Sequence, residues 1–427
     1  MVNNERQLIC YKLLNEVFLD NAYGSILLNE ALSSVKDEKD RAYISSLFYG
    51  VLEKNVQLDY ILRSLAPKKA RPAVEIVIKM GLYQMRYMLT PTYAAINETV
   101  EFVKKIGKGG VSGFVNAVLR KSENFSLPSE GELSPTDYLS VTFSVPKWIV
   151  GKLIKQYGYE FTKEFFAYEI DTRTHIRHNA NVISKVEFEK KLSKFDYSKS
   201  KLGYYVTHNM LKLLDKSSFT IQSLASMIAV NCYLTNDTHA PKVLDLCGAP
   251  GGKSIYLKEL CPNANVTCCD VHPHRVELIK KYAARMKADI TPALSDASAI
   301  FPEWFSAFDI VICDVPCSGI GVYKNKPDIL FSKHPTDIEK IKKIQLAILD
   351  NAKNYVKVGG VLCYSTCTVF KEENDDNITW FLQNNDNFVL DKISSPLVKD
   401  NDGMVKIFPH TYEGADGFFV ARLRRIK

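Results

Sequence analysis

The feature that most constrains this chain is a regular alternation of short apolar segments with helical segments, which begins at Lys242. Strands are predicted at 243–246, 265–270, 308–314 and 360–366, with another leading to 295–297. Strand and helix alternating at such intervals predict an α/β fold with a doubly wound parallel sheet. Ligands bind such sheets beyond the carboxyl ends of the strands, where this chain has its glycine-rich and cysteine-containing loops.

The first part of the chain has a different pattern. Its apolar residues recur at helical spacing, prolines separate the helical segments, and no strand-like alternation interrupts them, which predicts an all-α domain over residues 1–125. We expect a linker and a mixed α/β subdomain over 126–220, and the sheet domain over 221–427. Three parts suit a chain of 427 residues, because domains average about 150 residues.

Composition limits the class of protein. With 46% hydrophobic and 24% charged residues, the chain is typical of a globular protein. No apolar run approaches the ~18 residues of a membrane span, and the N-terminus lacks the pattern of a signal peptide. We therefore expect a cytoplasmic protein without membrane contact, whose ten cysteines are reduced thiols. The net charge of +7 favours a polyanionic partner.

The loop after the first predicted strand is rich in glycine, and Asp270 ends the next strand. Strand, glycine-rich turn and helix, followed by an acid that can bind ribose hydroxyls, are common to dinucleotide and S-adenosylmethionine sites. The loop fits neither G-x-G-x-x-G nor the phosphate-binding P-loop pattern. It comprises Cys247, Gly248, Ala249, Pro250, Gly251, Gly252 and Lys253.

Two later loops contain the chemically reactive residues. Asp314 and Cys317 follow one predicted strand and Cys367 follows the next, so the two thiols should flank one cleft. A thiolate that adds to C6 of a pyrimidine makes C5 nucleophilic enough to accept a methyl group. An acid near N3 would stabilise the resulting charge, and a base must then remove the C5 proton. These residues alone do not decide which thiol attacks.

A zinc site is the alternative for the cysteines of these strands and loops. The spacing of Cys313, Cys317, Cys363 and Cys367 is compatible in number with structural zinc. However, Cys313 and Cys363 fall inside apolar strands, where cysteine behaves as a small core residue. We therefore expect no metal.

Three long motifs resemble those of the Nop2/Sun RNA 5-methylcytosine methyltransferases. They lie at 246–253, 314–318 and 364–368, and correspond to that family's motifs I, IV and VI. Segments at 40–43, 94–98 and 113–120 are similar to the NusB-like RNA-binding domain. The combination is similar to the bacterial Sun/RsmB subgroup, which methylates a cytosine of 16S ribosomal RNA.

The resemblance implies roles for individual residues. Cys367 would be the nucleophile, Cys317 would assist release of the product, and Asp314 and Lys253 would lie close to the target base. S-adenosylmethionine would be the cofactor, in a Rossmann-like domain with a mostly parallel seven-stranded sheet. Its site would be lined by Cys247, Gly248, Ala249, Pro250, Gly251, Gly252, Lys253, Asp270, Arg275, Asp296 and Asp314. The partner would be 16S ribosomal RNA, at the position of cytosine 967; the sequence identifies no protein partner.

Some positions depart from the family pattern. Gly248 stands where the family more often has alanine, and we expect this exchange to glycine to be harmless in a tight turn. Ser223 replaces an aspartate of the family. The segment 177–179 matches the family's Arg-Val-Asn only loosely, so its RNA contact is in doubt, and a structural role at the surface is favoured for Arg173, Arg177 and His178. The basic glycine loop 104–110 is equally compatible with phosphate binding and with a solvated turn.

Other functions fit parts of the pattern. A non-catalytic RNA-binding or assembly factor would not need the intact pair Cys317 and Cys367. An NAD-type oxidoreductase is disfavoured by the broken dinucleotide fingerprint. C5 methylation of an RNA other than 16S ribosomal RNA is the remaining alternative.

Overall fold

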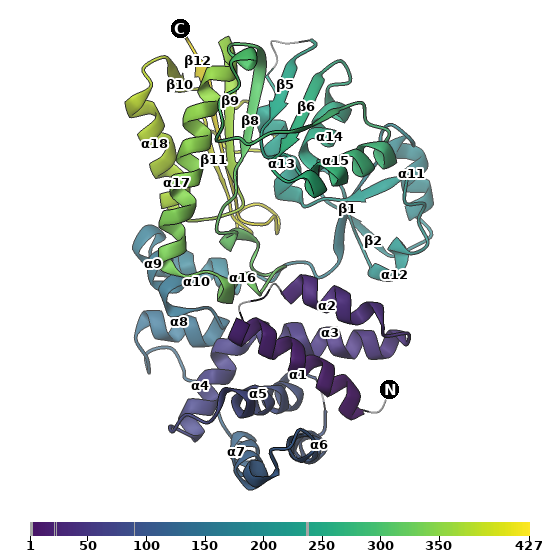
Figure 1. The fold of residues 1–427 in the computed structure, drawn as a ribbon, viewed down its shortest axis with the longest axis vertical. Helices are drawn as coiled ribbons and strands as arrows, with labels where there is room; N and C mark the ends of the chain where they lie inside the picture. The colour runs from purple at the N-terminus through teal and green to yellow at the C-terminus, as the bar shows by residue number, and fades with distance from the viewer. Residues whose placement is uncertain (1–2, 21, 23, 89, 236–238) are drawn as a thin grey trace. The chain divides into compact units, whose positions relative to one another are not determined.

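The computed structural model describes residues 3–20, 22, 24–88, 90–235 and 239–427. The chain forms two compact units, one of residues 1–167 with 323–334 and one of residues 168–322 with 335–427 (Figure 1). This division differs from the expected three parts, because the region expected as linker and subdomain is shared between the two units. No helix in the described ranges is long and apolar enough to cross a membrane.

The secondary structure of the first unit is helical in its described residues, which agrees with the all-α prediction for residues 1–125. Its core is apolar, and side chains such as Phe48, Ile61 and Leu119 are fully buried. The expected break in the chain separates α7 from α8 within this unit. The helices are α1 (Asn3–Asp20), α2 (Gly24–Ser33), α3 (Glu38–Glu53), α4 (Asn55–Leu65), α5 (Pro72–Tyr87), α6 (Thr92–Lys105), η1 (Gly109–Val111), α7 (Ser112–Ser122), α8 (Pro135–Phe143), α9 (Lys147–Tyr157) and α10 (Tyr159–Ala167).

A later segment of the chain, residues 323–334, also belongs to the first unit. It contains the short helix α16 (Ile329–Ser332). The Phe331 ring packs edge-on against Phe18 with centroids 5.9 Å apart, and Tyr323 contacts Phe166 at 6.0 Å. The chain therefore leaves the second unit just after the loop that contains Cys317 and returns to it at Pro335.

The second unit is built on a large mixed sheet. Seven strands follow the order β10-β12-β9-β8-β5-β6-β7, and β11 pairs as an eighth strand with β12. The pairs among β5 to β9 are parallel, whereas β12 runs antiparallel to its neighbours. The strands are β5 (Lys242–Asp245), β6 (Asn265–Asp270), β7 (Thr291–Leu294), β8 (Phe308–Asp314), β9 (Val356–Thr366), β10 (Phe388–Leu390), β11 (Met404–Ile407) and β12 (Phe418–Arg425).

Alternate side chains of the central strands enter two separate cores, one on each face of the sheet. Ile310 and Ile312 of β8 pack in the core with α13 to α15, whereas Val311 and Cys313 pack in the core with α17 and α18. Burial on both faces explains why these strands appear in the sequence as continuous apolar runs. The helices are α13 (Leu224–Tyr233), α14 (Gly252–Leu260), α15 (Pro273–Met286), α17 (Pro335–Ala352) and α18 (Asp375–Asn384), with 3-10 turns η2 (Pro302–Trp304), η3 (Ile320–Val322), η4 (Lys353–Tyr355) and η5 (Lys371–Glu373).

A smaller antiparallel sheet begins the second unit, in the order β2-β3-β1-β4. Ile176 of β1 is the register partner of Ile221 in β4, and the helix α11 packs its buried Phe188 and Leu192 into the small core of this sheet. A capping box of Ser184 and Glu187 starts α11. The elements are β1 (Thr174–His178), α11 (Lys185–Leu192), β2 (Tyr197–Lys199), β3 (Tyr204–Val206), α12 (His208–Leu211) and β4 (Phe219–Ile221).

Candidate active site

The predicted cofactor loop joins β5 to α14. The backbone N–H of Gly248 donates to Cys269 O of the neighbouring strand at 2.8 Å, and Gly251 N donates to Gly248 O at 2.7 Å. Gly251 has φ of 106° and is the N-cap of α14, a conformation that an L side chain rarely adopts. The first backbone N–H groups of α14 consequently open onto the carboxyl edge of the sheet, where the helix dipole favours a negatively charged group.

Gly248 lies in tighter surroundings than the sequence indicated. A Cβ at this position would lie 2.4 Å from Cys268 Sγ and 2.7 Å from Asp245 Oδ2. Glycine in place of the family's alanine is therefore compatible with these surroundings, whereas an alanine side chain would lie too close to its neighbours. The physical reason is that Cys268 fills the space beneath the turn that the family's more common residue would need.

Carboxylates surround the start of this loop. Burial raises the pKa of the Cys247 thiol well above its usual value, and the negative charges of Asp245, Asp314 and Asp270 raise it further. Asp245 was not among the predicted site residues, although it ends the first strand as Asp270 ends the second. It is fully buried, which raises its pKa to about 6, and its Oδ2 accepts a hydrogen bond from Ser254 Oγ at 2.6 Å.

Arg275 connects the loop to Asp270, and its part in a cofactor site stays a prediction. Its Nη1 lies 3.0 Å from Asp270 Oδ2, and its Nη2 donates to Ala249 O at 3.1 Å. Asp270 is buried and also accepts from the His272 backbone N–H. Asp296 is exposed and accepts from Ser298 N and Oγ, which lowers its pKa. The contacts of Asp296 are therefore local, and its part in a cofactor site stays a prediction.

Lys253 and Asp314 meet where two adjacent strands end. Lys253 Nζ lies 2.6 Å from Asp314 Oδ2. Burial disfavours the charged lysine, but the carboxylate outweighs this effect and the pKa of Lys253 is raised. The other oxygen of Asp314 accepts from Ser365 Oγ at 2.8 Å, and Ser365 also bonds the buried hydroxyl of Tyr233 at 2.6 Å. Sequence reasoning missed Ser365 and Tyr233, because neither residue type signals a site by itself.

The two cysteine loops lie side by side, as predicted. Cys317 Sγ and Cys367 Sγ are 3.2 Å apart. The hydrogen bond with Cys367, together with burial, raises the pKa of the Cys317 thiol well above its usual value. At this distance either sulfur can donate its S–H to the other. Such a donor stabilises negative charge on the accepting sulfur.

The remaining two cysteines of the zinc alternative lie elsewhere. Cys313 and Cys363 are fully buried in strands β8 and β9, in agreement with their interpretation as core residues. Among the residues that the structure describes, no group of three His, Cys, Asp or Glu side chains is arranged to hold a metal ion.

The segment compared with the family's Arg-Val-Asn is internal. Arg177 has 1% of its surface exposed and forms an ion pair with Glu259 of α14 through Nη1. The guanidinium also lies over the Tyr256 ring, 4.7 Å from its centroid. The favoured role of Arg177 at the surface was therefore wrong, whereas a structural role is confirmed. The carboxylate of Glu259, which lies in the same unit, explains how the charge is accommodated.

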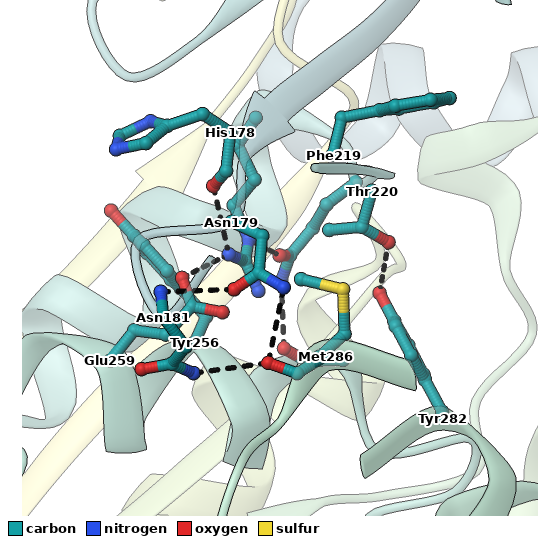
Figure 2. Close-up of polar contacts among 12 residues, drawn as sticks. His178, Asn179, Asn181, Phe219, Thr220, Tyr256, Glu259, Tyr282 and Met286 are labelled. Atoms are coloured by element: carbon teal, nitrogen blue, oxygen red, sulfur yellow. Dashed lines mark hydrogen bonds and ion pairs between the residues drawn. The ribbon is translucent and has the colours of Figure 1, made fainter. Parts of the chain in front are cut away.

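Further contacts join the small sheet to α15, as Figure 2 shows. Asn179 and Asn181 both donate to the carbonyl oxygen of Met286 at the end of the helix, at 3.1 and 3.2 Å. The hydroxyls of Thr220 and Tyr282 are 2.5 Å apart. The two amide bonds satisfy the Met286 carbonyl, which the end of the helix leaves without a partner inside the helix.

The same network extends to the cofactor loop. Arg177 Nε donates to Gln222 Oε1 at 2.6 Å, and Gln222 Nε2 donates to the carbonyl of Gly252 at 3.3 Å. The small sheet is thus connected by side chains to the first residue of α14. Arg173, by contrast, pairs with the nearby Asp171 in a partly exposed position.

The residues at the carboxyl edge fit S-adenosylmethionine. Gly248 and Gly251 allow the tight turn between β5 and α14, because Cys268 and Asp245 lie where a Cβ of Gly248 would be and Gly251 has a positive φ. Asp270 provides the acid that can bind ribose hydroxyls. Asp245 and Asp314 add negative charge beside the loop, which suits a sulfonium cation. Fold and site together define the class of protein: an S-adenosylmethionine-dependent methyltransferase.

Comparison with known proteins specifies the class further. Residues 232–424 match the family model described as 16S rRNA methyltransferase RsmB/F, and residues 4–124 match the NusB family. The probable ribosomal RNA small subunit methyltransferase B of Bacillus subtilis is 32% identical over 446 residues, which cover 98% of each chain. The ribosomal RNA small subunit methyltransferase B of Photorhabdus laumondii is 28% identical, also over 98% of each chain. The chain belongs to the RsmB/F family of ribosomal RNA small subunit methyltransferases.

A solved structure supports the fold over the whole chain. The crystal structure of PH0851 matches 99% of this chain with a TM-score of 0.77, at 22% sequence identity, and the match covers 98% of that protein. The expected combination of a NusB-like helical region with a Rossmann-like methyltransferase sheet is confirmed. RNA is the substrate of the family to which the chain belongs.

Proposed function

We propose that this enzyme forms 5-methylcytosine in 16S ribosomal RNA, at the position of cytosine 967, with Cys367 as the nucleophile. The observation that carries the proposal is the pair of thiols 3.2 Å apart, next to the ion pair of Asp314 and Lys253. A thiolate beside a carboxylic acid suits methylation of an unreactive pyrimidine carbon.

In the first step the Cys367 thiolate adds to C6 of the cytosine. A carbon–sulfur bond forms, the displaced electron pair reaches N3, and N3 takes up the proton that Lys253 Nζ shares with the Asp314 carboxylate. The Cys317 S–H stabilises the thiolate before the attack. Lys253 fixes the position of Asp314, so that the carboxyl group remains at the strand end.

Addition at C6 makes C5 a nucleophile. S-adenosylmethionine, when bound, supplies the methyl group as an electrophile, and the residues at 247–253 and Asp270 would hold it. A base must then take up the C5 proton, so that the C5–C6 double bond re-forms, the carbon–sulfur bond breaks and Cys367 is released as a thiolate. Cys317 lies next to the reacting sulfur and is proposed to assist this release.

The helical first unit is proposed to contribute to RNA binding, in line with its match to the NusB family. Its loop at 104–110 lies between α6 and α7, and a role in phosphate binding stays a prediction. The moderate net charge of the whole chain implies salt-sensitive binding.

The test is methyl transfer from labelled S-adenosylmethionine to unmodified 16S ribosomal RNA, with mapping of the labelled nucleotide. Native protein should label C5 of cytosine, and Cys367→Ala should abolish the label. Cys317→Ala should accumulate a covalent RNA–protein adduct, because release is impaired. Label on another atom, or full turnover by Cys367→Ala, would refute the proposed mechanism. Label at C5 in a different RNA would refute only the proposal that 16S ribosomal RNA is the substrate.

A further inference from the structure

A buried carboxyl group lies directly beneath the loop of Cys317. Glu373, at the end of η5, has no exposed surface. Its Oε2 accepts from Ser318 N at 2.8 Å and its Oε1 accepts from Ser318 Oγ at 2.5 Å. A buried carboxyl group is costly unless such donors satisfy it, so this position is strongly specified.

Glu373 also reaches the other side of Cys317. Gln345 Nε2, from α17, donates to Glu373 Oε2 and to the carbonyl of Pro316, each at 3.0 Å. The residues on both sides of Cys317, Pro316 and Ser318, are therefore held by one carboxyl group, either directly or through one amide.

The next residue holds the other cysteine loop in the same manner. Asn374 Oδ1 accepts from Thr366 Oγ1 at 2.6 Å, and Asn374 Nδ2 donates to Thr368 O at 3.1 Å. Thr366 and Thr368 are the residues on either side of Cys367. The consecutive residues Glu373 and Asn374 thus each bracket one of the two cysteines.

The two brackets are joined to each other. Ser318 Oγ and Thr368 Oγ1 are 2.7 Å apart, and Gly321 N donates to Cys367 O at 3.0 Å. All four bracketing side chains, Glu373, Asn374, Ser318 and Thr368, are less than 4% exposed. Burial raises the pKa of Glu373, while the bonds from Ser318, Gln345 and Thr368 oppose that rise.

We propose that Glu373 and Asn374 are positioning residues that set the separation and orientation of the Cys317 and Cys367 thiols. The catalytic roles of the two cysteines rest on the proposed function. The claim that Glu373 and Asn374 set the separation of the two sulfur atoms does not depend on it. Each acts through the backbone and hydroxyl groups next to a cysteine, so that a small displacement of one loop would separate the two sulfur atoms.

The first readout is independent of catalysis. Diamide oxidises two neighbouring thiols to a disulfide and is itself reduced to the hydrazine, so the rate of closure between Cys317 and Cys367 measures their alignment. We expect Glu373→Gln and Asn374→Asp to slow this closure by about tenfold or more, with circular dichroism and melting confirming a folded protein. Glutamine has one acceptor oxygen and cannot accept at both the Oε1 and the Oε2 positions of Glu373, and aspartate cannot donate to Thr368 O.

The second readout is methyl transfer. Both variants should lower kcat by about ten- to hundredfold, because misplacement of reacting groups by about 1 Å costs that much. KM for S-adenosylmethionine should stay within about twofold of the native value. Asp376→Asn, an exposed carboxylate on the same segment, is the matched control and should behave as the native protein.

Folded Glu373→Gln and Asn374→Asp that close the disulfide at the native rate and keep native kcat would overturn the proposal. If the Glu373 variant does not fold, Ser318→Ala removes only one hydroxyl of the bracket and should still slow closure. If the native protein methylates no RNA but the variants slow closure, the proposed function is wrong and the positioning role stands.

Discussion

Replacing Arg177 by methionine tests whether this residue is an internal contact or binds RNA. The side chains of Arg177 and Glu259 are 2% and 4% exposed. Methionine fills a similar volume but leaves the carboxylate buried without its cation, which costs about 3–5 kcal/mol. In a unit of this size that loss lowers the melting temperature by roughly 10 °C.

The pH dependence of this loss has a predicted sign. Burial raises the pKa of Glu259, and Arg177 partly offsets the rise. Without the arginine the pKa rises further, so that protonation relieves the buried charge as the pH falls. The melting temperature of Arg177→Met should therefore lie closer to that of the native protein at pH 5 than at pH 8.

Two controls complete the experiment. Adding Glu259→Leu to Arg177→Met removes the orphaned charge and should restore most of the lost stability. Arg173→Met, which breaks a partly exposed ion pair, should cost about 1 kcal/mol or less. RNA binding by Arg177→Met should keep the native dependence on salt. A variant that melts like the native protein and loses about one unit of salt slope would instead identify a phosphate contact and refute the reasoning.

Two further predictions concern the cofactor loop. Gly248→Ala should destabilise the protein by about 1–3 kcal/mol, and Cys268→Ala should relieve part of that loss, because its sulfur is the nearest obstacle; native melting of Gly248→Ala alone would contradict this. Burial raises the pKa of Asp245 to about 6, from the usual 3.8. Between these pH values the folded state keeps a proton on this carboxyl group that the unfolded state has released. The free energy of unfolding therefore falls as the pH rises through this range. Asp245→Asn should accordingly gain about 3 kcal/mol relative to the native protein between pH 4 and pH 8, and an unchanged difference in the free energy of unfolding at the two pH values would show that Asp245 is not protonated there.

Sequence patterns predicted the parts of the fold that depend on local residues. The strands at 265–270 and 308–314 agree with β6 and β8 to the residue, since both are apolar runs that end in an aspartate. The individual strands of the small sheet could not be predicted in this way. Its strands β2, β3 and β4 have three residues each, too few for a period, and Ile176 finds its partner Ile221 only in the folded chain.

Charged residues in the interior were the hardest to predict. Arg177 and Glu259 are separated by 82 positions, and each by itself has the character of a surface residue. Glu373 has its donors on Ser318 and Gln345, 55 and 28 positions away. The cysteines were predictable because their loops follow neighbouring parallel strands. The groups that hold those loops come from other elements, which the pattern of one segment does not indicate.

The segment 323–334, which belongs to the first unit although it follows the Cys317 loop, affects how truncated forms of this protein should be designed. Because Tyr323 and Phe331 pack with Phe166 and Phe18, cutting the chain after residue 167 would strip both rings of their partners. A truncated second half would present an apolar strip just beyond the Cys317 loop and would be prone to aggregate. The helical unit can therefore not be removed by a single cut in the chain. Replacing it with the helical unit of a relative requires replacing residues 323–334 as well.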